Sequence, residues 1–291
     1  MRNKQEVDAA THKDHQQALL QLLREFDRVC RILGIPYVLF AGTALGAVRH
    51  GGFIPWDDDL DVMMLRDDYE RFLREADTVL DRERFFLQGE FSEHWPMFFS
   101  KLRLNGTTCL EKLHPKDPKM HQGVYMDIFP CDNALGSEMG RKLQFLSSKI
   151  VIAKSLHKRG YETNSIVKKV FMAVCSLLPA KPFLALTGAG RGDSPVVHSF
   201  FAAARSYRKN IYPRSWFTQR KEISFEGGSY PITAEHDALL TMLYGDYMTL
   251  PEPHERVVKQ HALLVDLEKS YEEYADYRDN MTFETHTRSI R

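Results

Sequence analysis

The chain has 291 residues, about twice the usual domain size, so one elaborated domain or two small ones are expected. Its 39 lysine and arginine residues are cancelled by 39 aspartate and glutamate residues, which argues against a basic nucleic-acid-binding protein. The four cysteines lie far apart without a CxxC pair, which excludes a zinc-ligand pattern and a disulfide framework. The polar amino terminus lacks the apolar core of a signal peptide, so we expect a cytoplasmic location.

The first part of the chain predicts alternating helices and strands. Apolar side chains at helical spacing predict a helix over residues 15–33. The run YVLFA at residues 37–41 predicts a buried strand, and residues 60–65 predict a second one. Between these strands, Gly42-Thr43 opens a short helical stretch.

The next helix and three further strands continue this mixed pattern. Asp67 or Asp68 is expected to cap a helix that follows the second strand. The apolar face of that helix consists of Tyr69, Phe72, Leu73, Ala76 and Leu80. Further strands are predicted over residues 84–88, 97–104 and 124–129, so the first half is expected to be mixed α/β.

Beyond residue 137 the composition changes, and apolar spacing predicts mostly helices up to about residue 210. Short runs at 223–225 and 229–232 flank a Glu-Gly-Gly turn and predict a hairpin, and a helix is expected over residues 235–244. No linker separates these parts. We therefore expect a catalytic part over residues 1–136 and a helical part over residues 137–215 that partly covers the cleft. Residues 216–291, which contain the hairpin, the last helix and a charged tail, are expected to complete the same domain.

Residues 170–190 form the most apolar segment of the chain. Pro179 interrupts it after nine residues, and a membrane-spanning helix needs about 20. We favour a buried pair of helices. The alternative is a shallow, peripheral contact with the inner face of a membrane, where nearby basic residues would meet anionic head groups; these are Lys154, Lys158, Arg159, Lys168 and Lys169.

An acidic cluster precedes and enters the second predicted strand. If this segment is extended, Asp57, Asp59 and Asp61 share one face, while Asp58 and Leu60 take the other. Three carboxylates so close together repel one another unless a cation compensates them. Hard oxygen ligands suit Mg²⁺ or Mn²⁺. The alternative is a solvated acidic turn.

A further carboxylate, Asp127, lies among large apolar residues in the strand predicted over residues 124–129. An unpaired charge there would cost several kcal/mol, so Asp127 needs a cation, a set of N–H donors or a metal. A salt bridge to Arg103 or Arg49 is the structural alternative to a metal site. Two carboxylates on one strand and a third on its neighbour are typical of metal-assisted phosphoryl chemistry.

The segment Gly42–His50, followed by Gly52–Asp61, resembles the signature of the LicD/fukutin-type phosphotransferases. The similarity continues in four later stretches, which are residues 66–72, residues 101–108, Tyr125–Pro130 and residues 244–251. The resemblance implies a nucleotidyltransferase fold, an α/β (α+β) arrangement of a mixed sheet flanked by helices, with a largely helical insertion. Members of this family are associated with moving phosphocholine from CDP-choline onto cell-surface glycans or teichoic acids, or ribitol phosphate from CDP-ribitol.

The resemblance also implies roles for individual residues. Asp59, Asp61 and Asp127 match the catalytic carboxylates, and Asp57 is an additional ligand, so that the four would hold Mg²⁺ or Mn²⁺. The CDP-linked donor would contact the turn before the acidic cluster and nearby cations, namely Gly42, Thr43, Arg49, Lys101 and Arg103. For the three cations, balancing the charge of the acidic cluster is an equally good interpretation.

The resulting hypothesis is a metal-dependent transferase that moves a substituted phosphate to a hydroxyl of a glycan or teichoic-acid precursor. The first alternative is a nucleotidyltransferase that moves a nucleotide from an NTP to a small acceptor. The second is a non-catalytic factor that binds a nucleotide or metal during surface-glycan assembly. The acidic cluster alone does not distinguish the two enzymes.

Overall fold

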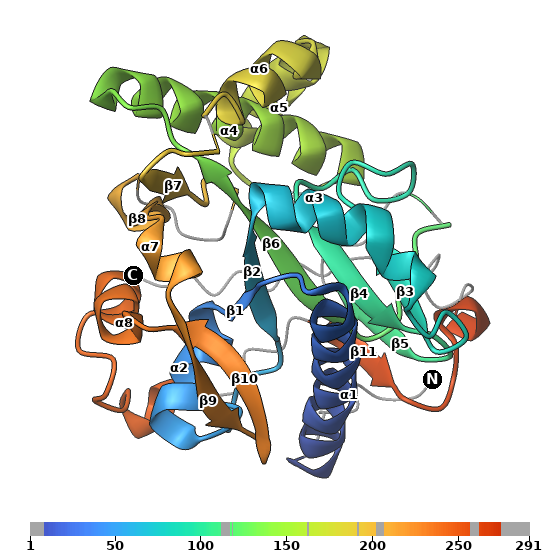
Figure 1. Cartoon of the computed structure of the whole chain (residues 1–291). Coiled ribbons are helices and arrows are strands. Elements are labelled where there is room, and N and C mark those ends of the chain that lie inside the picture. The colour runs from blue at the N-terminus through green and yellow to red at the C-terminus, as the bar shows by residue number, and fades with distance from the viewer. Residues whose placement is uncertain are drawn as a thin grey trace.

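The computed structural model describes residues 9–111, 117, 119–161, 163–190, 192–201, 207–256 and 262–274. Its centre is a mixed β-sheet flanked by helices, which confirms the expected α/β architecture (Figure 1). The strand order is β1-β2-β6-β4-β3, and β7 and β8 continue the sheet from β6. The strands are β1 (Val38–Leu39), β2 (Asp61–Leu65), β3 (Phe85–Gln88), β4 (Ser100–Leu104), β6 (Tyr125–Asn133), β7 (Val196–His198) and β8 (Ile211–Pro213).

The two central strands, β2 and β6, are parallel, and every other pair in this sheet is antiparallel. The buried residues of β2, Val62, Met63 and Met64, form a continuous apolar run, as expected for a strand covered on both faces. β1 is only two residues long because the chain turns directly into a helix at Ala41. The two parallel strands therefore lie at the middle of the sheet.

Two helices, α1 (Ala9–Leu33) and α3 (Arg66–Glu75), pack on one face of the sheet (Figure 1). The predicted apolar face of α3 is confirmed: Tyr69 and Phe72 are fully buried, and the chain continues into the short 3₁₀ turn η1 (Ala76–Thr78). The predicted cap is wrong. Leu65 occupies the N-cap without a side-chain bond, and Asp67 and Asp68 lie in the first turn, where their charges still favour the helix dipole.

The region after β6 is helical, as predicted, but only as far as residue 187. Its helices are α4 (Glu138–Arg159), α5 (Ile166–Leu177) and α6 (Ala180–Thr187), and Ser137 and Ser165 cap the first two through side-chain hydrogen bonds. β7, the 3₁₀ turn η2 (Arg208–Asn210) and β8 follow. The predicted helical part over residues 137–215 therefore ends early, because its last residues pair with β6 and extend the central sheet.

The remaining elements lie around the ends of the central strands. α2 (Ala41–His50) contacts both α8 (His236–Tyr244) and the hairpin of β9 (Arg220–Phe225) and β10 (Gly228–Thr233), which is preceded by α7 (Ser215–Thr218). The predicted hairpin and last helix are thus confirmed. The 3₁₀ turn η3 (Pro253–Glu255) follows α8.

A separate two-stranded sheet was not foreseen. It consists of β5 (Thr108–Glu111) and β11 (Ala262–Asp266), which are antiparallel, and the 3₁₀ turn η4 (Tyr271–Tyr274) follows it. The charged tail after residue 274 lies outside the described residues.

Candidate active site

The acidic cluster forms where β2 and β6 run side by side. Asp61 is the first residue of β2, and its Cα partner on the parallel strand β6 is Asp127. Residues paired in this way direct their side chains to the same face of a sheet. Asp59 lies two residues before β2 rather than within it, a small correction to the sequence prediction.

The predicted alternation before β2 is confirmed. Asp58 and Leu60 are buried, with exposed fractions of 8% and 1%, whereas Asp57, Asp59 and Asp61 are only half-buried. The three half-buried carboxylates are therefore the ones that share a face with Asp127.

The start of α2 lies against these carboxylates. A methyl group added to Gly42 would lie 2.7 Å from Oδ2 of Asp57 and 3.8 Å from Oδ1 of Asp59, so a glycine is needed for this close approach. Ala41, just before it, has a φ of +46°, a region that L-residues rarely adopt. Thr43 is buried, and its Oγ1 accepts a hydrogen bond of 2.8 Å from the backbone N–H of Asp61. These contacts fix α2, the acidic segment and β2 relative to one another.

The carboxylates influence one another electrostatically. The pKa of Asp61 is raised well above its usual value, first by burial and then by the charges of Asp59, Asp127 and Asp57. The same carboxylates, Asp61, Asp57 and Asp59, add to the effect of burial in raising the pKa of Tyr244 at the end of α8. A cation placed among these groups would relieve their repulsion.

The four carboxylates have the chemistry of a divalent cation site but not a preassembled geometry. In the described part of the chain, no three acidic, histidine or cysteine side chains form a preassembled ligand set. The donor chemistry nevertheless fits, since Asp57, Asp59, Asp61 and Asp127 offer the hard oxygens that Mg²⁺ and Mn²⁺ prefer. Asp59, Asp127 and Asp57 are also close enough to Asp61 for their charges to raise its pKa. These four residues, the Asp cluster, thus have the charge and the oxygen ligands for a cation.

Asp127 has an ion-pair partner, and it is Lys101. Lys101 is its Cα partner on β4, and Nζ of Lys101 lies 3.0 Å from Oδ1 of Asp127. Lys101 is almost fully buried, and its ammonium lies over the ring of Tyr125, 3.0 Å from the centroid. The alternative given for Asp127, a salt bridge to Arg103 or Arg49, is therefore wrong, because the register between β4 and β6 brings Lys101 opposite Asp127 instead.

Two further residues, Glu111 and Arg159, complete this network. Nζ of Lys101 lies 3.5 Å from Oε1 of Glu111, and Arg159, in the last turn of α4, forms an ion pair with the other oxygen of Glu111. Burial alone would raise the pKa of Glu111, but Lys101, Arg159 and Arg103 together hold it far below its usual value. Neither Glu111 nor Arg159 was foreseen, because they lie 48 residues apart and far from the acidic motif.

The structure does not bring the two predicted arginines to the acidic cluster. Arg103 is fully buried and donates from Nε to Gln88 and from one terminal nitrogen to the carbonyl of Gly123. Arg49, at the end of α2, donates to the carbonyl of Tyr247. Burial lowers the pKa of Arg49, and the charge of Arg256 lowers it further, so two cations lie near each other there. Arg49 keeps the chemistry of a phosphate contact, whereas Arg103 is held inside the sheet, where its charge acts on Glu111.

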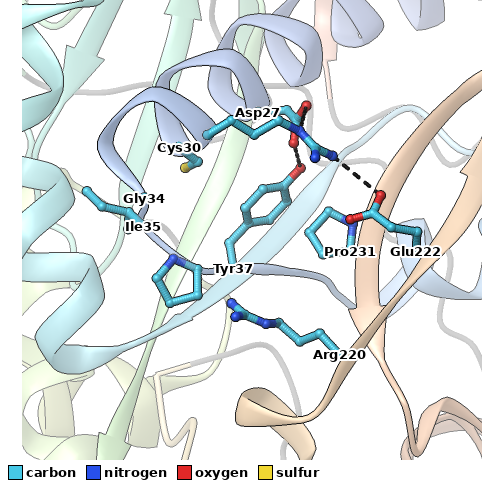
Figure 2. A pocket seen from close by; sticks show the side chains of 10 residues that line it. Asp27, Cys30, Gly34, Ile35, Tyr37, Arg220, Glu222 and Pro231 are labelled. Atoms are coloured by element: carbon cyan, nitrogen blue, oxygen red, sulfur yellow. Dashed lines mark hydrogen bonds and ion pairs between the residues drawn. The ribbon is translucent and has the colours of Figure 1, made fainter.

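A second feature is a cavity of about 330 Å³ between the end of α1, β1 and the β9–β10 hairpin (Figure 2). Tyr37 donates to Asp27 over 2.8 Å, and Arg31 lies 3.4 Å from Glu222 across the opening. This cavity is at the opposite end of β1 from Asp61, whose carbonyl accepts from the N–H of Phe40. Arg31 pairs with both Asp27 and Glu222, and none of the four carboxylates of the acidic cluster lines this cavity.

Comparisons with known proteins match the region that carries this site. The family described as LicD/FKTN/FKRP, nucleotidyltransferase domain, matches residues 34–134, which include all four carboxylates, Thr43, Lys101 and Glu111. The lipopolysaccharide cholinephosphotransferase LicD of Haemophilus influenzae is 27% identical over 252 residues, covering 83% of this chain and 92% of that protein.

A second named relative covers a shorter segment. The ribitol 5-phosphate transferase FKRP of Mus musculus is 30% identical over 135 residues, covering 38% of this chain and 27% of that protein. An uncharacterised protein of Rickettsia typhi is 42% identical over 55 residues, covering 19% of this chain and 18% of its own. Residues 34–134 therefore match the nucleotidyltransferase domain of the LicD/FKTN/FKRP family, and the chain is homologous to the cholinephosphotransferase and ribitol phosphate transferase named above.

Proposed function

We propose that the chain is a phosphotransferase that moves a substituted phosphate from a CDP-linked donor to a hydroxyl of a glycan, with Mg²⁺ or Mn²⁺ held by the Asp cluster. Homology to two named phosphotransferases supports the enzyme class and a glycan acceptor. The observation that carries the proposal is the pairing of Asp61 with Asp127 on parallel strands, with Asp57 and Asp59 gathered against Gly42.

In the proposed reaction, the acceptor oxygen forms a bond to the phosphorus that carries the head group. The bond between this phosphorus and the bridging oxygen of the diphosphate breaks, and CMP leaves. The proton of the acceptor hydroxyl passes to a carboxylate of the Asp cluster. A divalent cation bound there would neutralise charge on the phosphate oxygens.

The chain's own residues position these groups. Thr43 fixes the backbone of Asp61, and Gly42 leaves room for the carboxylates of Asp57 and Asp59. Lys101 holds Asp127 from the side opposite Asp61 and is too deeply buried to contact the donor itself. We therefore assign Lys101 a positioning role. Arg49, with Arg256 near it, is the candidate contact for donor phosphate.

The test is an analysis of products from purified protein with Mg²⁺ and separate CDP-choline, CDP-ribitol, CDP-glycerol and NTP substrates. We expect CMP from one of the CDP-linked donors, with transfer of its phosphate-linked head group to a glycan acceptor. Pyrophosphate from an NTP, with a nucleotide on the acceptor, would instead identify a nucleotidyltransferase.

Further measurements distinguish the proposed enzyme from the remaining alternative, a non-catalytic binding factor. The Asp59→Asn variant should release no CMP, whereas Asp77→Asn, on an exposed position of η1, should behave as the wild type. Donor binding without any turnover by the folded wild-type protein, over the full set of donors and both cations, would favour a non-catalytic binding factor. Turnover unaffected by EDTA would contradict the metal-dependent part of the proposal.

A further inference from the structure

The apolar side chains exposed on this protein are concentrated on two neighbouring helices. Fifteen large apolar side chains are exposed among the described residues, and nine of them lie on α4 and α5. Six belong to α5, with exposed fractions from 47% for Phe171 to 85% for Leu177; the others are Ile166, Val167, Val170 and Val174. The prediction of a buried helix pair is therefore wrong for α5, because only Met172 and Cys175 of this helix are buried, against α4.

The six exposed residues form one face of α5. At 3.6 residues per turn they fall within an arc of about 140°. Lys169 lies about 60° outside one edge of this arc, whereas Lys168 falls between Met172 and Cys175, the buried residues of the helix, although its own side chain is exposed. An exposed apolar stripe with lysines near it is typical of a helix that lies in a membrane interface, since the long lysine side chains can reach the head groups.

The charge of the helical layer points to the same kind of partner. Residues 137–190 contain nine lysine and arginine residues and two glutamates, although the whole chain has no net charge. Four exposed lysines in this layer have no ion pair with any residue that the structure describes; they are Lys158, Lys168, Lys169 and Lys181. This excess of positive charge complements an anionic surface. It would repel a second copy of the same face.

The shape of the layer suits a surface contact rather than a membrane span. No single helix among the described residues is long and apolar enough to cross a membrane. Together α5 and α6 would be long and apolar enough to cross a membrane, but the two helices meet at an angle of 99°. α5 has 12 residues and is about 18 Å long, whereas the hydrocarbon core is about 30 Å thick.

From these observations we infer that the exposed face of α5, supported by the lysines of α4–α6, docks onto the surface of a lipid bilayer with anionic head groups. The apolar side chains enter the boundary between head groups and acyl chains, and the helix axis lies in the membrane plane. Docking of α5 does not depend on the proposed chemistry. The docked helix is nevertheless linked to the active site, because it packs against α4, which ends at Arg159. The ion pair of Arg159 with Glu111 belongs to the network that holds Asp127.

The first test is co-sedimentation of the full chain with vesicles of phosphatidylcholine that contain 30% phosphatidylglycerol or none. We expect binding to the anionic vesicles that weakens with salt, and much weaker binding to neutral vesicles. Full-length protein that stays in the supernatant with both kinds of vesicle would overturn the inference. So would a dimer in solution that forms through α5 and does not bind vesicles.

Paired substitutions test the surface itself. Val170→Ser with Phe171→Ser, and separately Lys168→Glu with Lys169→Glu, should each weaken binding about tenfold or more. These side chains are exposed, so the variants should keep the circular dichroism spectrum and melting temperature of the wild type. Matched controls are Ile32→Ser, which is 57% exposed on α1, and Lys221→Glu, which is exposed on β9. Equal binding by the test variants and the controls would contradict docking through α5.

The depth to which α5 enters the bilayer provides a second measurement. Phe171→Trp should show added tryptophan fluorescence that is quenched by lipids brominated on their acyl chains, since an interfacial helix buries its apolar face about 5–10 Å deep. Ile32→Trp should show no such quenching. If the tryptophan at position 171 is not quenched in the vesicle-bound protein, the contact is made elsewhere and the inference is wrong.

Discussion

Asp61 and Asp127 occupy directly paired positions on two parallel strands, although 66 residues separate them in the chain. The same residue of β6 is paired on its other side with Lys101 of β4. Asp127 thus lies between a carboxylate and an ammonium, and burial raises its pKa while Lys101 lowers it. This arrangement keeps a second acid beside Asp61 in spite of their repulsion, which is what a cation site on this face requires.

Gly42→Ala should separate activity from stability. The added methyl group would lie 2.7 Å from the carboxylate of Asp57, so that side chain must move. Alanine is favoured over glycine in a helix by about 0.5–1 kcal/mol, so the melting temperature should be unchanged or slightly higher. Transfer activity should fall at least about tenfold, or 1.4 kcal/mol in the barrier. Activity at the wild-type level would show that the position of the Asp57 carboxylate does not matter.

Thr43 should act through its hydroxyl. Thr43→Val removes the acceptor for the N–H of Asp61 but keeps the shape of the side chain, and we expect a loss of about 1–2 kcal/mol in the free energy of unfolding, together with reduced activity. Thr43→Ser keeps the acceptor and is the matched control, with activity close to the wild type. Urea denaturation and the transfer assay measure both effects. If Thr43→Ser is harmful and Thr43→Val is not, packing of the methyl group, and not the hydrogen bond, is what matters.

Glu111 should be a stability residue of the site. It is surrounded by Lys101, Arg103 and Arg159, so Glu111→Gln leaves three buried cations without their shared anion. We expect a loss of about 3–5 kcal/mol in the free energy of unfolding. Glu83→Gln, at an exposed position, should have no effect.

A double variant tests the cause of that loss. Adding Arg159→Met to Glu111→Gln removes a buried cation whose ion pair among the described residues was with Glu111, so part of the stability should return. A strictly additive loss in the double variant would mean that Arg159 and Glu111 do not interact.

His198 should make the fold sensitive to acid. It is fully buried on β7, its Nε2 lies 3.1 Å from the carbonyl of Thr187, and burial lowers its pKa to about 4. In the unfolded chain the imidazole binds a proton below its usual pKa of about 6.5, whereas in the folded protein it does so only below about 4. The free energy of unfolding therefore falls as the pH falls from about 6.5 to about 4.

Urea denaturation at pH 7.5 and pH 5.0 measures this contribution. The loss of stability between the two should be about 2 kcal/mol smaller in His198→Gln than in the wild type. His157→Gln, at an exposed position on α4, should leave the difference unchanged. His15 and His121, with pKa values lowered by burial to about 4 and about 3, contribute in the same direction in all three proteins. An identical pH dependence in the His198 variant would contradict the assignment.

The sequence predicted those parts of the fold that depend on local periodicity. The alternation of Asp57, Asp59 and Asp61 with buried Asp58 and Leu60 follows from the period of an extended chain, and the structure has it. The long helices and the β9–β10 hairpin were predicted for the same reason. β7 and β8 were missed because they follow a region whose apolar spacing is helical, and β5 and β11 were missed because they pair only with each other, across distant parts of the chain.

The partners of Asp127 could not be read from local patterns. Whether Lys101 or Arg103 lies opposite it depends on the register of β4 against β6, which is set by the packing of the whole sheet. Glu111 and Arg159 join the site only because β5 and the last turn of α4 meet there. The exposure of α5 was also hidden, since an apolar helix face has the same sequence pattern whether protein or another surface covers it.

The central claim is that the four carboxylates bind one divalent cation, and titration with Mn²⁺ tests it most directly. The wild type and the exposed-site control Asp77→Asn should bind Mn²⁺ alike, in competition with Mg²⁺. Asp61→Asn should bind at least about tenfold more weakly, yet be as stable as the wild type or more stable without metal, because one of the repelling charges is gone. Equal Mn²⁺ affinity in Asp61→Asn and the wild type, or no binding by either, would contradict the account.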